Sequence, residues 1–143
     1  MEQTLIDSHS EAETFAFGRS LGEKAQPGQV YVLSGDLGAG KTVLSKGFAA
    51  GLGITEPVTS PTFTIVKMYE GGRLPLYHLD VYRIGDISEM EEIGLEEMLS
   101  EGGVCLIEWG ERVAEILPPD AVSIRIDRSD DADFNHRRIT CLS

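Results

Sequence analysis

The sequence predicts a three-layer α/β domain with a mixed parallel and antiparallel sheet. Apolar runs typical of strands alternate along the chain with stretches of helical periodicity, a pattern that favours parallel strands joined by helical crossovers. Two of the β-rich runs are joined across Gly71-Gly72, which indicates a hairpin and therefore an antiparallel pair. The length of 143 residues predicts a single domain, spanning 1–143.

Local signals set the expected boundaries of the elements. Ser10-Glu11-Ala12-Glu13 is a capping-box pattern, so a helix should begin there and end near Pro27-Gly28. Val104-Cys105-Leu106-Ile107 is a continuous apolar run, as expected of a buried central strand. The other expected elements are, in chain order, a strand over 30–33 that ends at 34–35, a helix over 41–50, a loop over 54–62, strands over 63–69 and 74–79, a helical stretch over 88–100, an alternating strand over 122–126, a polar turn over 127–135 and a last strand over 139–142.

The most informative motif is Gly35-Asp36-Leu37-Gly38-Ala39-Gly40-Lys41-Thr42, which fits the phosphate-loop pattern G-x-x-x-x-G-K-[ST]. Its glycines let backbone N–H groups surround phosphate oxygens. Lys41, on the loop surface, would bring a positive charge to the β- and γ-phosphates, and the Thr42 hydroxyl is suited to ligate Mg²⁺. A random chain of this length matches the pattern well under ~1% of the time. With a strand before the loop and a helix after it, the motif predicts a P-loop NTPase-like domain.

Two carboxylates are candidates to work with this loop. Glu108 follows the buried run 104–107 directly, which is where phosphate-loop proteins keep the acid that holds Mg²⁺ or the attacking water. The alternative is a solvated loop glutamate. Asp80 follows the run 76–79 and is a second candidate for the Mg²⁺ shell, with an ion pair to Arg83 as its alternative.

Three further side chains are weaker candidates. Thr62 follows Ser60-Pro61, and loop threonines in phosphate-loop switches sense the γ-phosphate and the metal, although such a residue is more often a turn or strand-start residue. Trp109 lines the site or is partly buried against the core. His78 is expected to pack within its strand and not to act as a base.

Composition excludes several classes of protein. No apolar run approaches the ~18 residues of a membrane-spanning helix, and the N-terminus has no secretion signal. Cys105 and Cys141 lie in apolar strand-like runs, which favours reduced thiols in a cytosolic protein. The formal net charge of −12 argues against strong binding of nucleic acid by the isolated chain.

Four motifs in this order resemble one family closely, the bacterial TsaE (also called YjeE) proteins. The resemblance runs along nearly the whole chain, and the acidic stretch Glu91-Glu92-Ile93-Gly94-Leu95 also looks like a family segment. The four motifs are Gly35-Asp36-Leu37-Gly38-Ala39-Gly40-Lys41-Thr42, Ser60-Pro61-Thr62-Phe63, His78-Leu79-Asp80-Val81-Tyr82-Arg83 and Cys105-Leu106-Ile107-Glu108-Trp109.

The resemblance implies a Mg²⁺-dependent ATPase that binds ATP or ADP and is required for threonylcarbamoyladenosine modification of tRNA. It further implies a cytoplasmic protein that acts with the partner proteins TsaB and TsaD and meets tRNA only through that complex. By position, Thr42 and Glu108 would ligate magnesium, with Asp80 close to the metal. Leu37 to Thr42 would hold the phosphates, Glu11 would lie near the nucleotide, and Arg137 or Arg138 would supply a contact from the last strand.

Other functions remain open on the sequence alone. A small P-loop kinase would carry the same loop, but the arginines expected of a kinase lid are scattered here. A GTPase is disfavoured because the chain contains no N-K-x-D or T-K-x-D sequence. A non-catalytic, nucleotide-dependent binding module would have the same motifs as a slow ATPase that is triggered by its partners.

Overall fold

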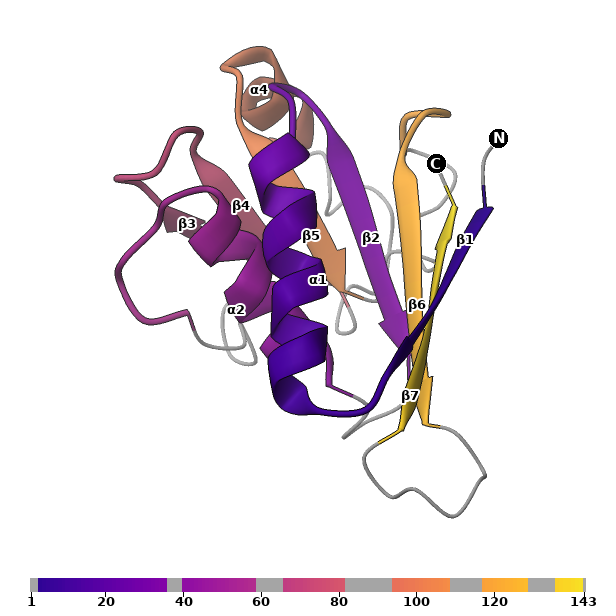
Figure 1. Cartoon of the computed structure of the whole chain (residues 1–143). Helices are drawn as coiled ribbons and strands as arrows, with labels where there is room; N and C mark the ends of the chain where they lie inside the picture. The colour runs from indigo at the N-terminus through magenta and orange to yellow at the C-terminus, as the bar shows by residue number, and fades with distance from the viewer. Residues whose placement is uncertain are drawn as a thin grey trace.

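In a computed structural model, the described part of the chain folds into a seven-stranded mixed sheet with helices on its faces (Figure 1). The structure describes residues 3–35, 40–58, 66–81, 94–108, 117–128 and 136–142. The elements are, in chain order, β1 (Gln3–Ser8), α1 (Glu11–Lys24), β2 (Val30–Gly35), α2 (Lys41–Gly51), β3 (Val66–Tyr69), β4 (Leu76–Asp80), α4 (Leu95–Ser100), β5 (Val104–Glu108), β6 (Val122–Arg128) and β7 (Arg137–Leu142).

The strand order explains why polar residues from distant parts of the chain meet at one edge. The order is β1-β7-β6-β2-β5-β4-β3, and β6, β2, β5 and β4 are parallel to their neighbours within this group. Their carboxyl ends therefore lie together, at the lower end of the sheet in Figure 1. The outer strands β7, β1 and β3 pair antiparallel, so the predicted mixed sheet is confirmed.

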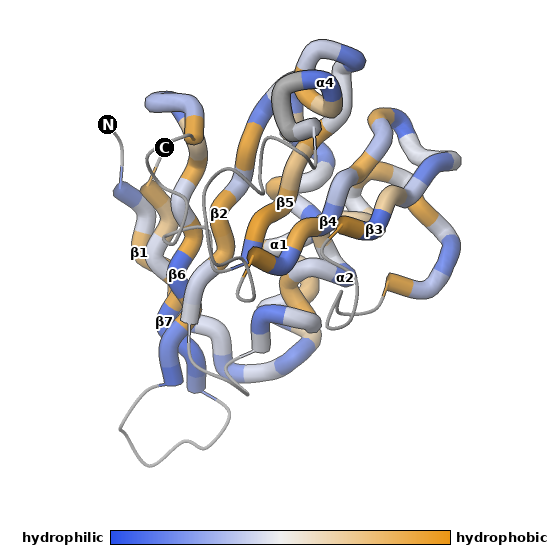
Figure 2. The backbone as a smooth tube through the Cα atoms, turned by 180° about the vertical axis from the view of Figure 1, so that it is seen from behind, coloured by the Kyte–Doolittle hydropathy of each residue, from blue (hydrophilic) through white to orange (hydrophobic). Residues whose placement is uncertain are grey.

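The two faces of the sheet bury separate apolar clusters. On one face, Leu33 and Leu106 pack with Leu44 and Phe48 of α2, and α1 covers the same cluster. On the other face, residues such as Ile107 belong to a second cluster, against which side chains of α4 pack. Viewed from behind, Figure 2 shows hydrophobic residues along β5 and its neighbours. The central strand β5 is buried along its whole length, as the apolar run predicts.

Helices α1 and α2 pack backbone to backbone, because glycines line their contact. A Cβ atom added to Gly47 would lie 2.1 Å from the carbonyl oxygen of Phe15, and one added to Gly22 would lie 2.1 Å from that of Phe48. The obstructing atoms belong to the backbone, so no side-chain rotation relieves the clash. The close contact holds α2 against α1, and it therefore also fixes the position of the first turn of α2, which begins at Lys41.

We expect Gly47→Ala to lower the free energy of unfolding by about 1–3 kcal/mol, the usual cost of overpacking. In an open helix the same change would raise stability by up to about 1 kcal/mol, because alanine is the better helix former. Urea unfolding measures the difference. Ala16→Ser, on the exposed face of α1, is the matched control and should shift stability by less than about 0.5 kcal/mol. A Gly47→Ala chain at least as stable as the unmodified chain would contradict the close packing.

Three boundaries differ from the sequence prediction. The strand β1 was not predicted; it is mostly exposed and pairs along one side only, with β7. The expected helical stretch over 88–100 is not one helix, because Gly94 adopts a left-handed φ of 84° immediately before α4. The expected polar turn over 127–135 is wrong at Asp127 and Arg128, which continue β6 and pair with β7. Residues 82–93 and 129–135 lie outside the described residues.

The two cysteines are free thiols, as predicted. Cys105 in β5 and Cys141 in β7 are separated by two intervening strands, or roughly 14 Å at the usual strand spacing, which is too far for a disulfide. Burial raises the pKa of the Cys105 thiol to about 12. Among the described helices, none is long and apolar enough to cross a membrane.

Candidate nucleotide-binding site

The two ends of the predicted phosphate loop adopt the geometry that the motif requires. Gly35 ends β2 with a φ of 145°, and Gly40 precedes α2 with a φ of 110°. A Cβ atom on Gly35 would lie 2.1 Å from the carbonyl oxygen of Ile126, so only glycine allows β2 to leave the sheet so close to β6. The strand before the motif and the helix after it therefore occur as predicted. The loop residues Asp36, Leu37, Gly38 and Ala39 lie outside the described residues.

The start of α2 directs backbone N–H groups that have no acceptor within the helix toward the end of β2. The first intrahelical hydrogen bond runs from Leu44 N to Gly40 O, so the N–H groups of residues 41–43 have no carbonyl partner within the helix. No side chain caps this end and no acidic residue lies in the first turn. These donors, together with the positive end of the helix dipole, suit a phosphate group.

Lys41 is less exposed than the sequence predicted. We expected it on the loop surface, yet it is buried with 8% of its surface exposed, while Thr42 beside it is exposed. Water therefore screens the charge of Lys41 less than it would screen a surface charge, which strengthens the attraction of Lys41 to an anion at the loop.

Asp80 and Glu108 lie side by side at the ends of adjacent strands. They are register partners in the parallel pair β4–β5, and Glu108 is also the partner of Leu33 in β2. Both carboxylates are on the face that α2 covers, because they continue the alternation of Leu76 and Leu106, which belong to the cluster beneath α2. Glu108 is 6% exposed, so the alternative of a solvated loop glutamate is wrong.

A buried histidine contacts the glutamate. His78, two residues before Asp80 and on the same face of β4, lies 2.9 Å from Glu108 through its Nε2 and Oε2 atoms. His78 is 1% exposed, in agreement with the expectation that it packs within its strand. The contact of His78 with Glu108 was not predicted from the sequence. The signal was the spacing of His78 and Asp80, which places both on one face at a strand end.

The donor set at this edge fits Mg²⁺ bound together with a phosphate. Mg²⁺ usually takes one or two carboxylates, while hydroxyl, phosphate and water oxygens supply the rest. Asp80, Glu108 and the Thr42 hydroxyl are donors of this kind. No group of three His, Cys, Asp or Glu residues with metal-binding geometry occurs within the described ranges.

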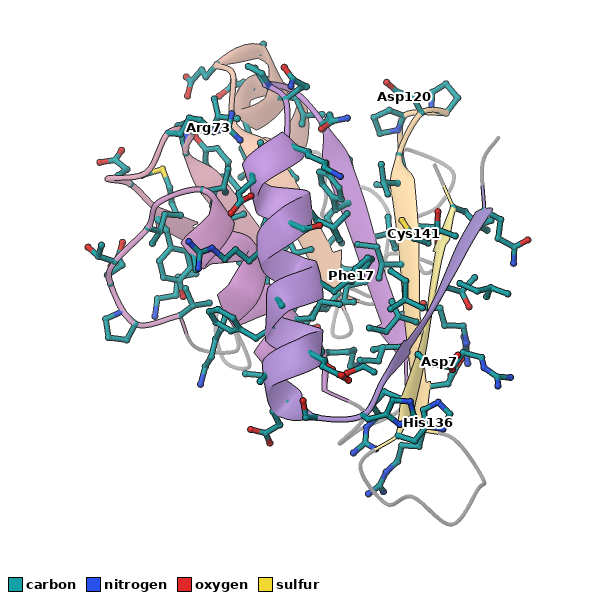
Figure 3. All side chains as sticks on the ribbon, in the orientation of Figure 1. Asp7, Phe17, Arg73, Asp120, His136 and Cys141 are labelled. Carbon is teal, nitrogen blue, oxygen red and sulfur yellow. The ribbon has the colours of Figure 1, made fainter. Side chains whose placement is uncertain are left out.

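A second group of polar residues surrounds the start of α1. His9 stacks on His136, with ring centroids 4.4 Å apart. His136 donates a 2.8 Å hydrogen bond to Asp7, and Figure 3 labels both of these residues. This hydrogen bond holds the pKa of the Asp7 carboxyl below its usual value. The stack joins the segment before Glu11 to the segment before Arg137, the two residues assigned to the nucleotide by resemblance.

The beginning of α1 also lies close to the phosphate loop. Ser10 caps the helix by accepting a 3.1 Å hydrogen bond from Glu13 N, as the capping-box pattern predicts. One turn on, Thr14 would lie 3.8 Å from a Cβ atom on Gly40. The structure thus brings the region of Glu11 to the same edge as the loop. Thr62, Arg83 and Trp109 lie outside the described residues, so their roles stay predictions.

Comparison with known proteins decides the family. The sequence model of the family described as "Threonylcarbamoyl adenosine biosynthesis protein TsaE" matches residues 8–139. The chain belongs to the TsaE family. It is 52% identical over 140 residues to the TsaE protein of Bacillus subtilis, covering 98% of this chain and 85% of that protein. It is 49% identical over 119 residues to TsaE of Treponema pallidum, covering 83% and 87%.

A solved structure supports the same assignment. The crystal structure of YdiB from Bacillus subtilis superposes with a TM-score of 0.83 at 44% sequence identity, covering 98% of this chain and 84% of that one. The resemblance drawn from the four motifs is thereby confirmed, and so is the predicted fold class. As a TsaE-family protein, the chain belongs to tRNA threonylcarbamoyladenosine biosynthesis.

Proposed function

We propose that this TsaE-family chain binds ATP with Mg²⁺ at the edge formed by β2, β5 and β4, and hydrolyses it in support of threonylcarbamoyladenosine modification of tRNA. The pairing of Asp80 with Glu108, beside the strand that leads into the phosphate loop, supports this most directly. It brings two carboxylates next to a helix start whose first N–H groups have no carbonyl partner within the helix and whose lysine suits phosphates.

Each side chain then has a distinct task. Lys41 and the backbone donors of α2 bind the β- and γ-phosphates, and Leu37 to Thr42 surround them. Thr42 and Glu108 hold the metal, with Asp80 beside it, and Thr62 senses the γ-phosphate. A bound Mg²⁺ would neutralise charge on the phosphate oxygens and so favour transfer of the γ-phosphoryl group from ATP to water. Glu11 and Arg137 contact the nucleotide from the α1 and β7 side.

We further propose that hydrolysis depends on the partner proteins TsaB and TsaD. One domain of this size leaves little chain for a separate substrate-binding unit. Val81 follows β4 at the edge that carries Glu108, and loops beside a bound γ-phosphate often reach their working geometry only when nucleotide and partner order them. With a net charge of −12, the chain would meet tRNA through the complex, in the cytoplasm, and not on its own surface.

Steady-state phosphate release is the measurement that tests this proposal. We expect slow release by the chain alone, no increase with TsaB or TsaD singly, and an increase of at least about tenfold with both, because positioning of the attacking water contributes orders of magnitude in rate. Fast transfer from ATP to a small acceptor without partners would identify a kinase instead. Nucleotide binding with no stimulation and no acceptor would identify a non-catalytic binding module.

A further inference from the structure

The buried contact between His78 and Glu108 gives the histidine a task that neither packing nor base catalysis describes. A carboxylate offers only acceptors, so the 2.9 Å contact requires His78 Nε2 to carry the hydrogen and donate it to Glu108 Oε2. Both side chains are almost fully enclosed, at 1% and 6% exposure. In such surroundings a hydrogen bond to a charged group is strong and holds its acceptor in one orientation.

The second ring nitrogen of His78, Nδ1, indicates that the hydrogen bond to Glu108 is the reason why position 78 carries a polar side chain. Nδ1 is buried and has no hydrogen-bond partner among the residues that the structure describes. Buried polar atoms are normally paired, and an unpaired one lowers stability. A leucine, as at Leu76 and Leu79 in the same strand, would fill the position without that cost. The histidine is therefore explained by what it does to Glu108.

The contact also divides the carboxylate between two tasks. Oε2 of Glu108 accepts a hydrogen bond from His78. Within the described residues, no group donates a hydrogen bond to the second oxygen, Oε1, and Oε1 is not a buried atom that lacks a partner. Glutamate has three side-chain torsions, and fixing them in advance lowers the entropy lost when a ligand binds. Many P-loop NTPases hold Mg²⁺ with an aspartate, whose shorter side chain has fewer torsions to fix.

We propose that His78 is the positioning residue of the metal site, and that its Nε2–H holds Glu108 with Oε1 directed to a nucleotide-bound divalent cation. The proposal rests on the proposed function, since it assumes that Glu108 binds Mg²⁺. His78 itself touches neither metal nor nucleotide. It acts on the affinity for Mg²⁺ and leaves the affinity for the nucleotide alone unchanged.

The test compares ADP binding by calorimetry in Mg²⁺ and in EDTA for three variants of His78. In His78→Leu the donor is gone; His78→Gln keeps an N–H near the position of Nε2; His78→Asn keeps a polar group that is too short to reach Glu108. We expect the Leu and Asn variants to need a Mg²⁺ concentration about 10- to 100-fold higher for the half-maximal increase in ADP affinity. This is the usual effect of removing a residue that orients a metal ligand. The Gln variant should recover most of the loss, and ADP affinity in EDTA should stay within about twofold in all three.

Thermal melting and a control separate this effect from misfolding. Leu79→Met changes the neighbouring buried position on the opposite face of β4 and should leave the response to Mg²⁺ unchanged. If His78→Leu does not fold, the comparison of Gln with Asn decides alone. An unchanged Mg²⁺ response in folded Leu or Asn variants, or an equal loss with and without Mg²⁺, would overturn the positioning role only. If the unmodified chain binds ADP with the same affinity in Mg²⁺ and in EDTA, the proposed metal site would be overturned as well.

Discussion

Replacing Lys41 with alanine is expected to weaken ATP binding by roughly 100-fold, which corresponds to the loss of a charge-assisted contact of about 3 kcal/mol. Lys41 begins α2 and is nearly enclosed beside the phosphate loop, so its charge acts in surroundings that contain little water. Alanine is a good helix former and leaves no buried charge behind, so the fold should persist. Calorimetry with ATP and Mg²⁺ measures the change.

Lys46→Ala is the matched control for this experiment. Lys46 lies on the same helix, one and a half turns further on, and is exposed. Its removal changes the net charge by the same amount and should leave ATP affinity within about twofold, because exposed charges at a distance are screened by salt. If Lys41→Ala binds ATP as tightly as the Lys46→Ala control, the phosphates are not held by this loop.

Replacing Glu108 with glutamine should reduce hydrolysis by about 10²–10³-fold, the size of effect seen when one group that stabilises the transition state electrostatically is removed. The amide has nearly the same shape, and its oxygen can still accept the hydrogen bond from His78. It lacks the charge that holds Mg²⁺, so ADP affinity in EDTA should change little. Single-turnover hydrolysis in the presence of both partner proteins separates the chemical step from binding.

Glu101→Gln is the corresponding control, because Glu101 is exposed at the opposite end of β5. It removes one negative charge without touching the carboxyl edge of the sheet. Equal hydrolysis by Glu108→Gln and the Glu101→Gln control would make Glu108 a structural residue, and Asp80, its register partner, would be the next candidate for the acid.

The sequence predicted the parts of the fold whose signals are local. The strand into Gly35, the helix from Lys41 and the apolar run before Glu108 were all found, because periodicity and glycine placement carry the information within a few residues. That Asp80 and Glu108 lie next to each other depends on the order of the strands in the sheet, which no local pattern encodes. From the residues, Asp80 was a second candidate for the Mg²⁺ shell at the end of its strand, and the resemblance to a family placed it close to the metal. The register of β4 and β5 brings the two carboxylates side by side.

What the sequence analysis missed depends on distant contacts. The strand β1 forms because β7 offers it an unpaired edge, and its own residues are mostly exposed and carry little pattern. The break at Gly94 reflects a left-handed turn that the surrounding acidic, helix-favouring residues conceal. His78 appeared to be a packing residue because its partner lies 30 residues away along the chain.

A crystal structure of the chain with ADP and Mg²⁺ tests the central proposal most directly. We expect the diphosphate within the loop between β2 and α2, with the Lys41 ammonium against the β-phosphate. The metal should lie about 2.1 Å from oxygens of Thr42 and Glu108, with water and phosphate completing its shell. A nucleotide bound elsewhere, or a metal that contacts neither Thr42 nor Glu108 directly or through one water, would contradict the assignment of this edge as the catalytic site.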